Sequence, residues 1–171
     1  GAAGALLDKM LFEAGLPRQQ VLCTNIMNEQ PPGNEFAYFL HDNPKKKADV
    51  RPLFRGVYAK EDLVKGVHRL WELITAVKPS LVVAAGNWPL WALSDHCTIK
   101  TVKGFKRPTG IGSWRGSQTF AIPEAGGLPL LPIIHPAAIL REYTERQITV
   151  HDLRARASRA NALQAAHGPA C

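Results

Sequence analysis

The chain has 171 residues, 46% of them hydrophobic, a length and composition that suit one domain with a sizeable core. No apolar run approaches the length of a membrane span, so we expect no membrane association. The three cysteines lack the spacing of a disulfide framework or a zinc knuckle. The formal net charge of +7 suits a polyanionic partner such as nucleic acid without requiring one. Because the first residue is glycine, we expect a segment of a longer protein.

The first part of the chain is predicted to hold two helices, with a strand and an irregular region between them. Apolar residues at helical spacing predict a helix over 4–15, which a Gly-Leu-Pro sequence ends. The stretch "VLCTNIM" at 21–27 is short and apolar and predicts a buried strand. Residues 36–58 show no clear period, so we expect a long basic loop. Helical spacing returns over 63–77 and stops before the next proline.

The remainder is predicted to alternate strands and helices. The run "SLVVAAG" predicts a buried strand over 80–86, and "NWPLWAL" predicts a helix whose early proline suits a first turn. Residues 98–116 are rich in glycine and basic residues and predict a loop. Two strands and then two helices are expected to follow, at 117–122, 129–135, 136–142 and 149–167.

Apolar strands that alternate with helices are typical of an α/β fold whose sheet is covered on both faces. We therefore expect a three-layer α/β/α architecture with a central, mainly parallel four-stranded sheet. In such sheets ligands bind at the carboxyl ends of the strands. Three predicted strands end on polar or small residues: Asn25, the pair Gly86 and Asn87, and His135.

Two of these residues have side chains suited to recognising a base. The amide of Asn25 offers both a donor and an acceptor and can match the edge of a nucleobase. The imidazole of His135 can donate to a carbonyl oxygen on which negative charge develops, and Pro136 restricts the backbone after it. The alternative is that Asn25 caps a turn and that His135 caps the following helix. Their shared position at strand ends favours a site.

Other residues could contact a phosphate backbone. Gly86 and Asn87 begin a predicted helix, where free N–H groups attract phosphate, although such a glycine also suits a tight turn. Lys106, Arg107 and Arg115 alternate with aromatic residues, a pattern that suits stacked bases and phosphates, and a solvated loop is the alternative. The other five histidines lack partners at ligand spacing and are expected on the surface.

Four stretches occur together in one order, namely "GLPRQQVLCTNIMNEQPPGN", "KPSLVVAAGN", "SWRG" and "IIHPAAILRE". Together they resemble the uracil-DNA glycosylase superfamily, most closely the family 4 enzymes of bacteria and archaea and their phage relatives. The resemblance runs from Gly1 to about Glu142. It implies a glycosylase-like α/β domain over 1–147, with 148–171 as an Ala/Arg-rich helix or tail outside it.

The resemblance implies a role for each matching residue. Asn25 would hydrogen-bond the edge of uracil, and His135 would stabilise negative charge on uracil O2 as the glycosidic bond breaks. The turn after His135 would contact DNA and wedge into the duplex in place of the flipped base. This turn comprises Pro136, Ala137, Ile139, Leu140 and Arg141, with alanine where the family often has a phosphate-contacting serine.

Three features of the family are missing from this stretch. The family's first motif, which positions the attacking water, and the phenylalanine that stacks on uracil would both precede Gly1. The iron–sulfur cysteines of family 4 are missing too, and Gly66 stands about where one is expected. Because three scattered cysteines cannot supply four thiolates, we expect no iron–sulfur cluster and no other cofactor.

The leading hypothesis is therefore a DNA glycosylase that flips uracil, or a related pyrimidine, out of DNA and hydrolyses its N-glycosidic bond. Its partner would be DNA, with a replication or repair protein as a further candidate, in the cytoplasm of a bacterium or a phage-infected host. One alternative is an inactive relative that binds DNA or a replication partner. Another acts on a modified pyrimidine in phage DNA, and a third is a nucleotide-binding α/β protein that uses Gly86 and Asn87.

Overall fold

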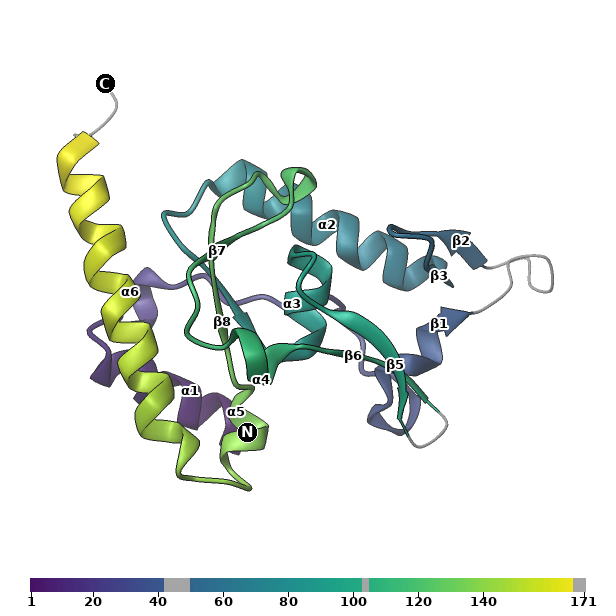
Figure 1. Cartoon of the computed structure of the whole chain (residues 1–171), viewed down its shortest axis with the longest axis horizontal. Helices are drawn as coiled ribbons and strands as arrows, with labels where there is room; N and C mark the ends of the chain where they lie inside the picture. Colours follow the sequence, from purple (N-terminus) through teal and green to yellow (C-terminus); the bar gives the residue numbers. More distant parts are fainter. Residues whose placement is uncertain (42–49, 103–104, 168–171) are drawn as a thin grey trace.

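The computed structural model describes residues 1–41, 50–102 and 105–167, and Figure 1 shows how their helices and strands are arranged. The α-helices are α1 (Ala2–Glu13), α2 (Glu61–Val77), α3 (Asn87–Leu93), α4 (Ile111–Trp114), α5 (Pro136–Ile139) and α6 (Glu145–His167). The strands are β1 (Leu40–His41), β2 (Val50–Pro52), β3 (Tyr58–Lys60), β4 (Val82–Ala85), β5 (Thr98–Val102), β6 (Phe105–Thr109), β7 (Thr119–Phe120) and β8 (Pro129–Ile133). The chain is thus a mixed α/β protein, as its alternating pattern predicts.

The central sheet is smaller than expected. It has the order β4-β8-β7, in which β4 and β8 are parallel and β7 is antiparallel to β8. The predicted strand at 21–27 is wrong, because this segment forms no ladder in the described structure. One guanidinium nitrogen of Arg69, on α2, instead hydrogen-bonds the carbonyl of Asn25 at 2.6 Å. The expected four-stranded, mainly parallel sheet is therefore not confirmed.

Two segments that were expected to be loops contain short antiparallel sheets. Residues 36–58 contribute β1 and β2, which both pair with β3. Residues 98–116 contribute the hairpin of β5 and β6 and the short helix α4. The β-branched residues of β5, such as Thr98, Ile99 and Thr101, favour a strand and were the available signal. The glycine and basic residues of the segment favour a loop instead, and the loop was the prediction.

Helices cover both faces of the central sheet, because side chains alternate across each strand. Val82 and Ala84 of β4 belong to a core cluster that includes buried residues of α2 and α3. Val83 and Ala85 pack against a second cluster, formed with α1, α5 and α6. Leu130 of β8 joins the first cluster, while the deeply buried Leu131 and Ile133 join the second. This arrangement leaves the carboxyl ends of β4 and β8 side by side.

Helix α6 begins at Glu145 and shares the second core cluster through Val150 and Leu153. Its Arg146 forms an ion pair with Glu13 of α1. The division of the chain at residue 147 stays a prediction. Among the described residues, no helix is both long and apolar enough to cross a membrane.

Candidate functional site

His135 stands between β8 and α5, where it is the N-cap residue of the helix. Its ring nitrogen Nδ1 accepts a hydrogen bond from the backbone N–H of Ala137 at 3.1 Å. Pro136 fills the first helical position and is buried. Because Nδ1 must be unprotonated to accept this bond, the neutral ring carries its proton on Nε2. The capping role and the donor role that were weighed as alternatives therefore use different nitrogens of the same ring.

Gly86 follows β4 and lies directly beside this imidazole. Its N–H donates to the carbonyl of Ile133 at 2.9 Å, which continues the parallel pairing to the last residues of the sheet. A Cβ at Gly86 would lie 3.1 Å from Cβ and 3.5 Å from Cδ2 of His135. The φ angle of Gly86 is +95°, a conformation that favours glycine. The structure thus brings these two predicted site residues together.

The imidazole is biased toward its neutral form. Partial removal of water lowers the pKa of His135 below its ordinary value, and the positive charge of Arg141 lowers it further. Protonation of Nδ1 would also break the hydrogen bond from Ala137. The residue as a whole remains exposed, so an approaching ligand can reach it. At neutral pH, His135 is therefore an uncharged N–H donor at the carboxyl end of β8.

Asn25 is exposed, and its backbone carbonyl accepts a hydrogen bond from Arg69 of α2. The bond from Arg69 uses the backbone carbonyl of Asn25, so it leaves the side-chain amide for another partner. The parallel ladder that was expected to place Asn25 beside His135 is not formed. Their joint action on one ligand stays a prediction.

Asn87 has a structural role in this molecule. Its Oδ1 accepts a hydrogen bond from the N–H of Ile111 at 2.9 Å, which ties the start of α3 to the start of α4. Its backbone carbonyl accepts a bond from the thiol of Cys97 at 3.6 Å. Phosphate binding by Gly86 and Asn87 stays a prediction, and the side-chain oxygen of Asn87 already has a partner.

The three basic residues predicted to bind DNA lie in different surroundings. Arg115 contacts two carboxylates of α6, with its Nη1 3.2 Å from Asp152 and its Nε 3.7 Å from Glu145. Arg107 pairs with Glu35, whose other oxygen accepts a bond from the N–H of Ala37. Lys106 lines a cavity on another face of the same hairpin. DNA contact by these residues stays a prediction, and two of them also hold the fold together.

In the turn after His135, the residues that were expected to form a wedge differ in their exposure to solvent. Ile139 has no exposed surface and belongs to the second core cluster, so it cannot insert into DNA without unfolding α5. Leu140 is 46% exposed, and Arg141 is also exposed. Tyr143, which no pattern in the sequence singles out, is 58% exposed two residues after Arg141. A wedge would therefore consist of Leu140 with its exposed neighbours, and Ile139 anchors the turn.

The described residues do not fit an iron–sulfur cluster. Cys97 is buried, and its thiol donates to the backbone carbonyl of Asn87. Cys23 is exposed, and no group of three or more metal-ligating side chains occurs among the residues that the structure describes. A Cβ at Gly66 would overlap the carbonyl oxygen of Ile26, so the backbone passes too close for a side chain there. Cys171 lies outside the described residues.

His96 was expected on the surface but is half-buried. Its ring stacks on Trp114 with centroids 3.7 Å apart, and its Nε2 hydrogen-bonds the hydroxyl of Thr119. Burial lowers the pKa of His96, while the charge of Asp95 opposes this shift. No local pattern in the sequence predicts the stack, because its two rings come from separate elements. It helps to fix α4 beside β7.

Comparison with known proteins identifies the family. The model of the uracil DNA glycosylase superfamily matches residues 1–162. Two curated relatives, both named type-4 uracil-DNA glycosylase, come from Archaeoglobus fulgidus and Thermotoga maritima. The first is 27% identical over 146 residues and the second 24% over 155, which is 82% and 90% of this chain. The chain spans 56% and 63% of these relatives' lengths. Since the family model covers most of the chain, the protein belongs to the uracil DNA glycosylase superfamily.

Proposed function

We propose that the protein takes part in removing uracil from DNA by hydrolysis of the N-glycosidic bond. Membership of the superfamily supports DNA as the substrate and base excision as the reaction. The observation that carries the proposal is the state of His135, a neutral imidazole whose Nδ1 is anchored and whose Nε2–H is left to donate. No step of the proposal requires a metal or an organic cofactor.

In this proposal, His135 stabilises the departing base. When the glycosidic bond breaks, its electron pair passes to the pyrimidine ring and negative charge collects on O2. A fixed N–H donor aimed at that oxygen stabilises the transition state more than the ground state. The hydrogen bond from the N–H of Ala137 to Nδ1 keeps the ring in one orientation, so little reorganisation is needed during the reaction.

Asn25 would select the base. The uracil edge presents an N–H donor beside a carbonyl acceptor, and a side-chain amide can satisfy both. For Asn25 to do so, the flipped base must lie between the 21–27 segment and the carboxyl end of β8. The base must leave the helix because the bond that is cleaved is not accessible in a stacked duplex. Leu140 and its exposed neighbours would then fill the gap in the stack.

Single-turnover excision assays on oligonucleotides that contain one uracil test this function. His135→Ala should slow the chemical step by roughly a hundredfold, as for loss of an oxyanion donor, and leave the dissociation constant for DNA nearly unchanged. His151→Ala is the matched control, because this histidine is 81% exposed on α6. It should react at the rate of the parent protein.

The same assay distinguishes the alternatives. DNA binding without excision by the parent protein would refute the proposal and favour an inactive DNA-binding relative. Release of a modified pyrimidine, but not of uracil, would refute the assignment of uracil.

We further propose that the reaction takes place in the cytoplasm of a bacterium or a phage-infected host, where a replication or repair protein is a candidate partner.

A further inference from the structure

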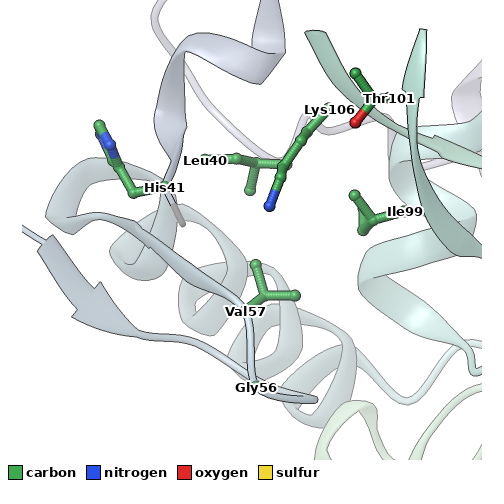
Figure 2. A pocket seen from close by; sticks show the side chains of 7 residues that line it. All are labelled: Leu40, His41, Gly56, Val57, Ile99, Thr101 and Lys106. Carbon is green, nitrogen blue, oxygen red and sulfur yellow. The ribbon is translucent and has the colours of Figure 1, made fainter. Parts of the chain in front are cut away.

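A cavity of about 210 Å³ lies between β1, the turn before β3 and the β5–β6 hairpin. Three aliphatic side chains contribute to its wall, those of Leu40, Val57 and Ile99, and His41 and Gly56 also line it. Figure 2 shows the side chain of Lys106 directed into the space between them, with the hydroxyl of Thr101 on the same side. His135 is not among the lining residues, so this cavity is separate from the site described above.

The register of the hairpin explains which residues reach the cavity. Thr101 pairs with Lys106 in the antiparallel ladder, and Lys100 pairs with Arg107. Since side chains of paired residues share a face, Lys106 and Thr101 lie on one face of the hairpin together with Ile99. Lys100 and Arg107 lie on the opposite face. The two adjacent basic residues of the sequence therefore point in different directions.

The cavity combines features that match a single nucleotide. Its volume is below the range of roughly 300–1,000 Å³ that is typical of drug-sized ligands, so it suits one base better than two. Aliphatic walls can hold the flat face of a base, as the pockets of base-flipping enzymes do. The ammonium of Lys106 attracts a phosphate, and the hydroxyl of Thr101 can donate to or accept from a base edge.

We propose that this cavity binds one unpaired nucleotide of a DNA strand, with the base against Leu40, Val57 and Ile99 and a phosphate near Lys106. The choice of a DNA strand as the source of the nucleotide rests on the proposed function. A base inside a duplex cannot enter such a space, so the cavity should favour single-stranded over double-stranded DNA. The protein would then hold its substrate at two places, at His135 and at this cavity.

Binding measurements with matched variants test the proposal. Fluorescence anisotropy with a labelled oligothymidylate at fixed salt should show affinity roughly fivefold or more weaker for Lys106→Ala and for Ile99→Ala. Lys100→Ala removes an equal charge from the opposite face of the hairpin and should weaken binding by less than about twofold. Melting curves show whether each variant remains folded. Equal losses for Lys106→Ala and Lys100→Ala would overturn the proposal, because charge alone would then explain binding.

A titration followed by methyl NMR measures ligand binding in the cavity and does not depend on enzymatic activity. Addition of the oligothymidylate should shift the methyl signals of Leu40, Val57 and Ile99, and an equal concentration of thymidine 5′-monophosphate should shift them much less. Unchanged methyl signals with both ligands would overturn the proposal. Equal affinity for the mononucleotide would overturn the choice of a DNA strand. Because these readouts need no excision, failure of the proposed function and failure of this proposal are distinguishable.

Discussion

Replacement of Gly86 by alanine should displace His135, because the two residues lie side by side after β4 and β8. The new Cβ would lie 3.1 Å from the Cβ of His135, closer than carbon atoms usually approach, and at an ordinary contact distance of 3.5 Å from Cδ2. Rotation of the imidazole does not move its Cβ, so it cannot relieve this contact. The backbones after β4 and β8 must therefore separate, and this movement should displace His135 and strain the hydrogen bond from Ala137 to Nδ1.

The size of the effect follows from the backbone strain at residue 86 and from the displacement of His135. Gly86 has φ +95° and ψ −179°, a region open essentially only to glycine, and a side chain there costs about 1–3 kcal/mol. For a protein of this size, each kcal/mol lowers the melting temperature by about 2–4 °C, so a loss of about 2–12 °C is expected. A displacement of His135 of about 1 Å should slow excision by roughly a hundredfold.

Three measurements on Gly86→Ala check this reasoning: the melting temperature, the single-turnover excision rate and the imidazole nitrogen shifts of His135 by NMR. In the parent protein, the nitrogen shifts should report a neutral ring protonated on Nε2. Gly112→Ala is the control, because a Cβ at this glycine of α4 meets nothing within 4 Å. A variant that melts within about 1 °C of the parent and keeps the nitrogen shifts of His135 would refute the steric argument.

Three further outcomes are expected. In the variant Cys171→Ser, iodoacetamide at pH 8 should label the exposed Cys23 rapidly and Cys97 only after unfolding, because burial raises the pKa of Cys97 to about 11. Equal labelling rates for Cys23 and Cys97 in the folded protein would contradict this. Arg115→Ala should lower the free energy of unfolding, measured in urea, by about 1–3 kcal/mol, because it leaves two partly buried carboxylates without their cation. Arg141 is exposed, so Arg141→Ala should change this free energy by about 0.5 kcal/mol or less. Because the folded-state pKa of His135 is lowered, the unfolded state binds more protons, and stability should fall as pH decreases from about 6.5 through that pKa. His135→Gln should reduce this fall in melting curves between pH 7 and 5, and an unchanged pH profile would show that the ring does not contribute.

Elements that depend on local pattern could be predicted from the sequence. The helical spacing over 63–77 corresponds to α2, and the apolar runs before Gly86 and His135 correspond to β4 and β8. A buried strand or an amphipathic helix carries its signal in neighbouring residues, so no distant partner has to be known. The sequence "HP" likewise predicts the cap at the start of α5, because proline suits the first helical position.

Elements whose state depends on distant partners could not be predicted. Residues 21–27 are apolar enough for a strand, but Arg69, 44 residues after Asn25, binds a carbonyl that a ladder would need. The wedge expected from the sequence included Ile139, and only the core cluster that it shares with residues of α1 and α6 shows that its side chain is buried.

The candidate site shows the same division. The sequence by itself determined that a histidine and a glycine end two buried strands, because both strands are visible as apolar runs. The tertiary structure decided that β4 and β8 are parallel neighbours, which places Gly86 against the ring of His135. It also decided that Lys106 faces a cavity while Arg107 faces Glu35, because strand pairing sends adjacent side chains to opposite faces. Composition determines how many charged side chains the chain has. Only the fold determines whether each of them contacts a carboxylate, lines a cavity or lies in solvent.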